Sequence, residues 1–235
     1  MIVRMREDMT RAALHDMWGC FLNPRSYPKS RIMTQTNTMR KTNNHKVRTV
    51  TMTAVLAAIS YILAFAEFPV PLTPSFARMD LSDFPALIGT FAFGPICGVM
   101  IELVKNGLQL LSTSTGGVGE FANFLMGGSY VLTAGLIYKF HKTKKTAWIA
   151  CLISSVVIGI VAAIANYFIL LPMFEMFMPL DQVIAAFGEF MPFIQTKLDV
   201  VLYNAFPFNL LKGLVIGVFT MAIYKRLTPV LKGVR

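Results

Sequence analysis

The segment SDFPALIGTFAFGPICGVMIELVKNGLQLLS (residues 82–112) decides how many times the chain crosses a membrane. It is long enough for one continuous apolar helix, but Gly94 and Pro95 stand near its middle. Proline removes a backbone donor and clashes with the preceding turn of a helix. A broken helix is tolerated at membrane depth where neighbouring helices satisfy the freed backbone groups. The segment therefore predicts two short helices joined at residues 93–95.

The composition indicates a membrane protein. Hydrophobic residues make up 55% of the chain and charged residues only 14%, whereas an average soluble domain carries about 25% charged residues. A helix needs about 20 apolar residues to cross a bilayer. Four further stretches approach or exceed that length, at about 50–66, 119–138, 147–171 and 205–224. The sequence therefore predicts an all-α membrane protein with six transmembrane helices, one of them short.

The distribution of basic residues predicts the orientation. Of the 22 Lys and Arg residues, ten fall in residues 1–48, four in KFHKTKK (139–145) and four after residue 224. With six helices these three segments share one side of the membrane, and the positive-inside rule makes that side the cytoplasm. We therefore expect both termini in the cytoplasm. The net charge of +10 is interpreted as orientation and contact with anionic lipid, not as nucleic-acid binding.

The chain is expected to contain one membrane domain with two cytoplasmic ends. Residues 1–46 lack the continuous apolar core of a signal peptide. We interpret them as a disordered leader or as the product of an upstream start codon, with a later methionine as the working start. Residues 47–228 are expected to form the six-helix domain that binds substrate, and residues 229–235 a cytoplasmic tail. The long outer loop 172–199 contains an amphipathic stretch, and its role is left open.

The sequence carries no recognisable machinery for catalysis or metal binding. No GxxxxGK[ST], HExxH or GxSxG motif is present, and the three cysteines share no motif spacing. The three histidines, His15, His45 and His141, all lie in the expected cytoplasmic flanks. We therefore expect no catalytic residue, no metal site and no enzymatic activity.

Two polar residues interrupt the second half of the broken segment. Lys105 and Asn106 stand within ELVKNGLQLL, one turn after Glu102. A charged group near the bilayer centre costs roughly 2.5–3.5 kcal/mol on insertion scales, so it normally faces the bundle interior or a cavity. Lys105 and Asn106 are therefore candidate substrate-binding residues. Pairing of Lys105 with Glu102 at i−3 is an equally open explanation.

Three more polar residues lie in the last two apolar stretches. Asn166 stands near the outer end of 147–171, and Asn209 and Lys212 stand in the outer part of 205–224. A lysine near a helix end can extend its ammonium to the interface, but this does not explain Asn209 on the same helical face. We therefore predict that Asn209 and Lys212 contact a ligand.

The first predicted helix carries small residues at close spacing. Ala54 and Ala58 stand four residues apart, and small residues at this spacing let another helix approach closely. Spacing alone favours ordinary packing within the bundle.

Four blocks of sequence resemble a known family. MDLSDFPALIGTFAFGPICGVMIELVKN, GEFANFLMG, ANYF…P and FPFNLLKG together resemble the riboflavin-binding S component of energy-coupling factor vitamin transporters. The resemblance covers roughly residues 48–228, and the leader has no counterpart. The long loop 172–199 departs from the family's pattern, so ligand contacts from it are uncertain.

The resemblance implies a function and roles for single residues. It implies that the chain binds riboflavin from outside and is re-oriented by a membrane coupling protein and two cytoplasmic ATPases. Asn166, Asn209 and Lys212 match the residues that contact the vitamin in that family. Ala54 and Ala58 match its docking face for the coupling protein. Riboflavin is then the transported ligand, and no cofactor is expected.

Three other functions are weighed against this one. The chain could be an S component for a different vitamin. It could be a stand-alone carrier coupled to protons or sodium, for which Glu102 and Glu120 are the candidate titrating acids. A membrane enzyme acting on lipid usually needs clustered Asp or His at the cytoplasmic face, which this sequence lacks.

Overall fold

The computed structural model describes the chain except residues 1–28, 70–77, 114–115, 177–178, 190–193 and 233–235. The described residues are almost wholly helical, with one pair of two-residue strands. The elements are α2 Lys29–Ala64, β1 Phe68–Pro69, β2 Arg78–Met79, α3 Asp83–Phe93, α4 Pro95–Gln109, a 3₁₀ turn Leu110–Ser112, α5 Val118–Phe140, α6 Lys144–Ala165, a π-helical turn Asn166–Leu170, α7 Leu171–Glu175, α8 Leu180–Gly188, α9 Lys197–Val200, a second π-helical turn Val201–Ala205, and α10 Phe206–Lys232.

The contacts divide the chain into two units, Met1–Arg48 and Thr49–Arg235. The first unit holds the beginning of α2. The second unit holds the rest of α2 and every later element. Since the predicted site residues all lie after Arg48, only the second unit is described further.

The predicted break in residues 82–112 is confirmed. Helix α3 ends at Phe93, and α4 begins at Pro95. Gly94 between them has φ of 109°, a conformation that side chains with a Cβ rarely adopt. Its amide still donates to the carbonyl of Thr90 at 2.9 Å, while Pro95 takes the first helical position, where its missing N–H costs nothing. The two short helices therefore arise from this Gly-Pro pair.

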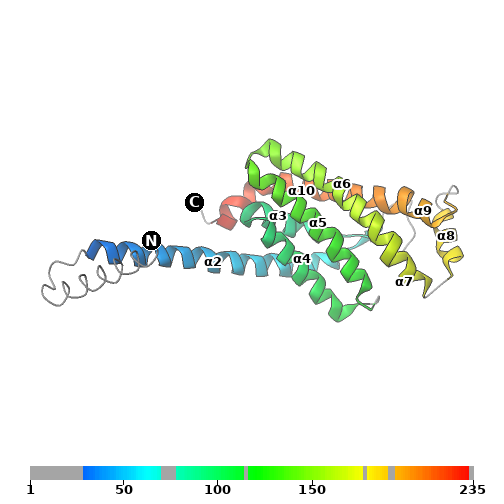
Figure 1. The fold of residues 1–235 in the computed structure, drawn as a ribbon, viewed down its shortest axis with the longest axis horizontal. Coiled ribbons are helices and arrows are strands. Elements are labelled where there is room, and N and C mark those ends of the chain that lie inside the picture. The colour runs from blue at the N-terminus through cyan, green and yellow to red at the C-terminus, as the bar shows by residue number, and fades with distance from the viewer. Residues whose placement is uncertain (1–28, 70–77, 114–115, 177–178, 190–193, 233–235) are drawn as a thin grey trace, which may run out of the picture. The chain divides into compact units, whose positions relative to one another are not determined.

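The later helices pack into one bundle. Helix α5 packs against α4 and α6, and α10 packs against α6 and α3 (Figure 1). Their shared core includes Leu87, Ile101, Tyr130, Ile158 and Ile216, each at most 1% exposed. The phenol of Tyr130 donates to the carbonyl of Gly213 at 2.8 Å, which satisfies a buried hydroxyl where α5 meets α10.

Small residues set the distance between α6 and α10. A Cβ added at Gly213 would lie 2.9 Å from Ser155 Oγ, and one added at Gly217 would lie 3.0 Å from Cys151 Cβ. The two backbones therefore approach more closely than larger residues would allow.

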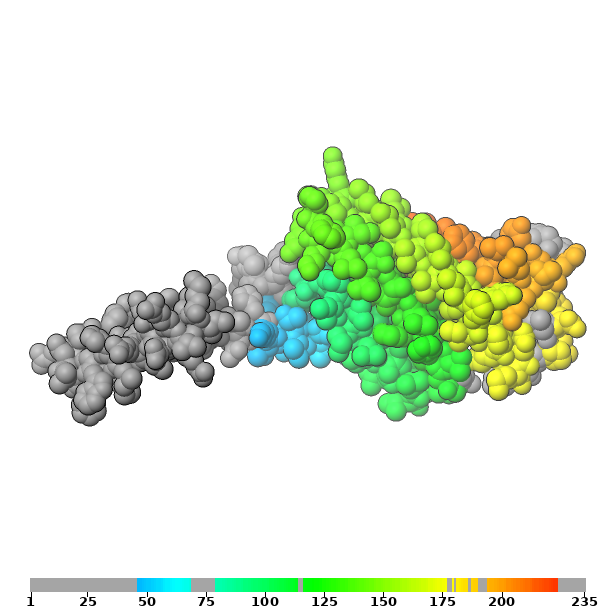
Figure 2. Space-filling view, in the orientation of Figure 1, coloured from blue at the N-terminus to red at the C-terminus, as the bar shows by residue number. Residues whose placement is uncertain are grey.

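Four helical stretches are long and apolar enough to cross a membrane: Lys46–Ala64, Val118–Phe140, Lys144–Glu175 and Lys197–Ile223. Helix α3 is apolar but shorter. Large apolar side chains on the outside of the bundle are exposed, as expected where lipid replaces water, including Leu132 and Leu136 on α5 and Leu152 and Ile160 on α6. Figure 2 shows the face on which α5 (green) and α6 (yellow-green) lie side by side. The nearly all-helical fold is confirmed, while six crossings and the cytoplasmic termini stay predictions.

Residues 172–199 are more helical than the predicted outer loop. Helix α7 continues the α6 run to Glu175, and α8 occupies the amphipathic stretch. A second apolar core explains why these short helices form, since Leu171, Val183, Phe187 and Ile194 are buried against one another with neighbouring residues. The described part of this segment therefore packs against the end of the bundle.

Candidate ligand-binding site

A pocket lies at the end of the bundle where α5 begins and α6 ends. Its volume is about 340 Å³, within the range of small-molecule sites. Its lining combines apolar and aromatic side chains with amides, carboxylates and one ammonium: Glu67, Asp80, Gln109, Gly119, Glu120, Asn123, Met126, Asn166, Leu170, Leu171, Phe174, Phe187, Val200, Asn204, Ala205, Phe208, Asn209 and Lys212. Apolar walls with a few convergent polar groups are typical of a site for a small organic ligand.

Two π-helical turns bring asparagines to this pocket. Asn166 begins the turn that follows α6, and Asn204 lies in the turn that precedes α10. The two turns contact each other. A π turn inserts an extra residue into the helical spacing and so changes the direction in which nearby side chains point, and such turns are frequent at functional sites.

Asn166 and Asn209 are oriented in the same way by their own helices. The side-chain amide nitrogen of Asn166 donates to the carbonyl of Ala162 at 2.8 Å, and that of Asn209 donates to Ala205 at 2.9 Å. Each bond uses one of the two N–H groups of an amide, whose oxygen is a separate acceptor. Each asparagine is thereby fixed in orientation and keeps an acceptor and a donor for a ligand in the pocket.

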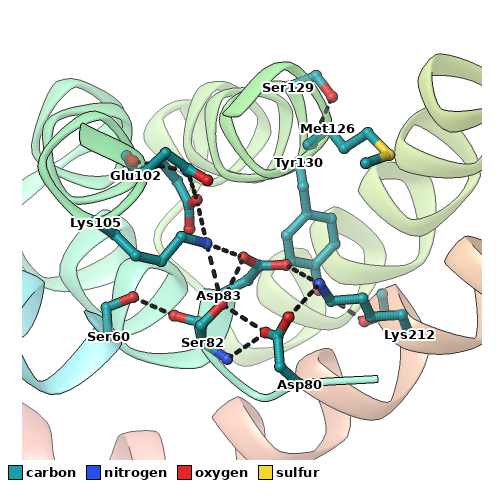
Figure 3. Close-up of polar contacts among 12 residues, drawn as sticks. Ser60, Asp80, Ser82, Asp83, Glu102, Lys105, Met126, Ser129, Tyr130 and Lys212 are labelled. Atoms are coloured by element: carbon teal, nitrogen blue, oxygen red, sulfur yellow. Dashed lines mark hydrogen bonds and ion pairs between the residues drawn. The ribbon is translucent and has the colours of Figure 1, made fainter. Parts of the chain in front are cut away.

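Lys212 joins the pocket to a buried chain of ion pairs (Figure 3). Its ammonium lies 3.4 Å from Asp80 Oδ2 and 3.2 Å from Asp83 Oδ2. Asp80 follows β2 and lines the pocket, whereas Asp83 begins α3 and does not. The side chain of Lys212 is 8% exposed and that of Asp83 only 1%. Lys212 therefore has one carboxylate in the pocket wall and one behind it.

Lys105 occupies the far end of this chain. Its ammonium lies 2.6 Å from Asp83 Oδ1 and 2.7 Å from Glu102 Oε2, and it donates to Ser82 Oγ at 3.0 Å. An ammonium has three N–H donors, so these three acceptors satisfy it completely. We call the series Asp80, Lys212, Asp83, Lys105 and Glu102 the ion-pair chain.

Helix α5 leaves room for the ion-pair chain at Gly127. A Cβ added there would lie 2.6 Å from Glu102 Oε2 and 3.3 Å from Asp83 Oδ1. On α4, Asn106 donates to the backbone carbonyl of Glu102 at 2.8 Å. Glycine at position 127 therefore lets α4 and α5 pack closely over two buried carboxylates, those of Asp83 and Glu102.

The structure places the predicted site residues in two groups. Asn166, Asn209 and Lys212 all line the pocket. Lys105 and Asn106 lie behind it, 0% and 4% exposed, and are not among its lining residues. The predicted pairing of Lys105 with Glu102 is present, together with a second and slightly shorter pair to Asp83 that the sequence did not indicate. A ligand role stays a prediction for all five.

Sequence reasoning missed several residues of the site. Asn123 and Asn204 line the pocket, and each is an amide within a largely apolar stretch, which was a usable signal. Asp83 is not among the predicted site residues, and no spacing in the sequence connects it to Lys212. Among the described residues no group of three or more His, Cys, Asp or Glu could hold a metal ion.

The predicted partner face lies outside the bundle core. Ala54 and Ala58 on α2 are exposed, whereas Ala57 between them is 1% exposed. The two alanines are therefore not needed for packing within the second unit. Docking of a partner there stays a prediction.

Comparison with known proteins gives consistent matches. Residues 48–224 match the family described as "ECF transporter, substrate-specific component". The chain is similar to the riboflavin transporter RibU of Staphylococcus aureus, with 37% identity over 83% of this chain and 98% of that protein. It is also similar to the riboflavin transporter FmnP of Bacillus subtilis, with 29% identity over 78% of this chain and 94% of that protein.

A solved structure supports the same relationship. It is described as the S component of a bacterial ECF transporter, and it matches with a TM-score of 0.65 and 35% sequence identity. The match covers 80% of this chain and 99% of that one.

Proposed function

The chain belongs to the family of substrate-specific components (S components) of ECF transporters, and we propose that it is the subunit that binds riboflavin for uptake. It is a multi-pass protein of the cell membrane. The family is one of transporter components, and we propose no chemical step on the ligand.

The make-up of the pocket carries this proposal. Riboflavin combines a flat ring system, polar along one edge, with a hydroxylated tail. Phe174, Phe187 and Phe208 offer aromatic and apolar wall to the ring faces. Asn209 and Lys212 lie one helical turn apart on α10 and offer amide groups and ammonium donors to the polar edge. The riboflavin transporters among the relatives point to the same ligand.

The proposed topology has six crossings with both termini in the cytoplasm. The 18 basic residues in segments 1–48, 139–145 and 225–235 support it, as does the apolar α3 that precedes α4 in the bundle. In this arrangement the pocket and α7–α9 lie toward the outside. The vitamin then enters from the extracellular face, and the ion-pair chain lies beneath it.

We further propose that ATP-driven partners complete the transport cycle. The sequence contains no phosphate-binding loop, which agrees with ATP hydrolysis by other subunits. The exposed Ala54 and Ala58 allow close approach of a helix from a membrane coupling protein. Two cytoplasmic ATPases would then drive the change of orientation through that protein. A stand-alone ion-coupled carrier is the alternative, and uptake that persists without any ATPase would favour it.

The proposal is tested by the absorption spectrum of the purified protein. A closed site that fits riboflavin should retain the vitamin through purification, so the flavin bands are expected in the spectrum. A colourless protein that riboflavin does not stabilise against heat, but another vitamin does, would replace riboflavin with that vitamin.

A further inference from the structure

We propose that Asp83 is a positioning residue for ligand binding, which holds the ammonium of Lys212 at the pocket wall, and that Lys105 acts on the ligand indirectly, by holding Asp83, and not by contact. This inference rests on the proposed function, because it concerns how the same pocket binds riboflavin. It assigns a role to the buried part of the ion-pair chain, which does not reach the pocket.

The first step concerns the freedom of Lys212. A lysine side chain has a flexible four-carbon stem and loses considerable entropy when its ammonium is fixed. Asp80 and Asp83 hold this ammonium from two sides, at 3.4 and 3.2 Å. The ammonium donates a hydrogen bond to Asp80 and forms an ion pair with Asp83, which leaves N–H donors for a ligand acceptor. The ammonium is therefore oriented before the ligand arrives, which lowers the entropy cost of binding.

The second step concerns the difference between the two carboxylates. The side chain of Asp80 is 15% exposed and lines the pocket, so ligand and water can reach it. The side chain of Asp83 is 1% exposed and is fixed at the first turn of α3. Asp80 is itself held by the Ser82 backbone amide, which donates to it at 2.8 Å, but it remains within reach of the ligand. Asp83 is therefore the partner whose distance to Lys212 the ligand cannot alter directly.

The third step concerns Lys105. A buried carboxylate with too little positive charge around it is strongly unfavourable. Lys105 lies 2.6 Å from Asp83, closer than Lys212 does, and it also holds Ser82 and Glu102. All three of its N–H groups are used, and its side chain is 0% exposed. Lys105 can therefore affect a ligand in this pocket by fixing Asp83, but has no donor left to contact one.

A double-mutant cycle tests the inference on the full-length purified protein by riboflavin titration. Asp83→Asn keeps the size of the side chain and removes its charge, so Lys212 loses its fixed partner. We expect the dissociation constant to rise about tenfold or more, similar to the change caused by Lys212→Met. In the double variant the two losses should not add, because a residue that acts through Lys212 has nothing to position once Lys212 is gone.

The bound flavin gives a second readout. If Asp83 acts by placing the ammonium beside the ligand, Asp83→Asn and Lys212→Met should shift the absorption spectrum of bound riboflavin in the same direction. Thr220→Val is the matched control, since Thr220 is fully buried on the same helix and donates to the Ile216 carbonyl in its own turn at 2.7 Å. This variant should change stability without changing the dissociation constant or the spectrum.

A second cycle combines Lys105→Met with Lys212→Met. It can be measured even if the Asp83→Asn variant does not fold. Its effect on the dissociation constant should disappear in a Lys212→Met background. Losses that add fully in both cycles would overturn the inference and leave a merely structural role for Asp83 and Lys105. A parent protein that binds no riboflavin would instead overturn the proposed function itself, so the two failures are distinguishable.

Discussion

The ammonium of Lys212 on α10 lies 3.2 Å from the carboxylate of Asp83 at the first turn of α3. These two residues connect the C-terminal helix to the broken α3–α4 segment. Through Asp83 the connection continues to Lys105 on α4 (Figure 3). The pocket and the bundle interior therefore share charged groups, and substitutions on either side are expected to affect both.

Gly127→Ala is expected to destabilise the protein. The added Cβ would lie 2.6 Å from Glu102 Oε2, so α5 must move or the ion-pair chain must shift, at a cost of roughly 1–3 kcal/mol. Gly107→Ala on α4 is the matched control, because a Cβ there meets nothing within 4 Å and raises helix propensity by up to about 1 kcal/mol. Thermal unfolding in detergent should show a lower melting temperature for Gly127→Ala and a higher one for Gly107→Ala. Equal changes in the melting temperature would contradict the packing described at Gly127.

Phosphorylated flavin is expected to bind more weakly than riboflavin. The pocket lining contains the carboxylates of Glu67, Asp80 and Glu120, and one ammonium that is already paired with two carboxylates. A phosphate that enters this lining is repelled, which should weaken binding about tenfold or more. Glu120→Gln should reduce the difference in affinity between riboflavin and the phosphorylated flavin. Asp181→Asn should leave that difference unchanged, because Asp181 is exposed on α8 and lies outside the lining. Competitive titration with flavin mononucleotide measures this difference in affinity. Equal affinities of the parent protein for the two ligands would contradict the expected repulsion.

Ala54→Trp and Ala58→Trp are expected to separate binding from transport. Both alanines are exposed and lie outside the pocket lining, so riboflavin binding should stay intact. A bulky ring would prevent the close approach of a partner helix, so ATP-driven uptake should be lost. Leu152→Trp, which places the same ring on the exposed face of α6, should leave uptake intact. Normal uptake by the Ala54→Trp/Ala58→Trp double variant, at normal expression, would contradict a role of these two residues in partner docking.

The topology predicts opposite labelling of two exposed sites. In a cysteine-free variant, Gln182→Cys on α8 should react with an impermeant thiol reagent from outside, and Thr143→Cys before α6 only from inside. Ser75, which the sequence also places outside, lies beyond the described residues. The reverse labelling pattern would invert the proposed orientation.

The sequence was sufficient for the break between α3 and α4 and for three residues of the pocket, Asn166, Asn209 and Lys212. The Gly94-Pro95 pair predicted the break between α3 and α4. Asn209 and Lys212 were predicted as ligand-binding residues because they are polar residues within an apolar helix. The π turn that begins at Asn166 could not be predicted, since its hydrogen bonds depend on packing between helices. The pairing of Asp83 with Lys212 could not be predicted either, because it joins elements far apart in the chain. The folding of residues 172–199 depends in the same way on a core shared with the end of α6.

The central claim is that the pocket binds riboflavin through Asn209 and Lys212, and fluorescence titration of purified variants tests it most directly. We expect flavin emission to be quenched on binding, and the dissociation constant then follows from the decrease in emission. Asn209→Ala and Lys212→Met should each weaken binding by roughly 1–3 kcal/mol, the cost of an unsatisfied buried partner, or about 5- to 150-fold. Lys197→Met, which removes a lysine paired with Glu175 outside the lining, should bind like the parent. If Lys212→Met and Asn209→Ala both bind riboflavin as tightly as the parent, these residues are structural and the vitamin binds elsewhere.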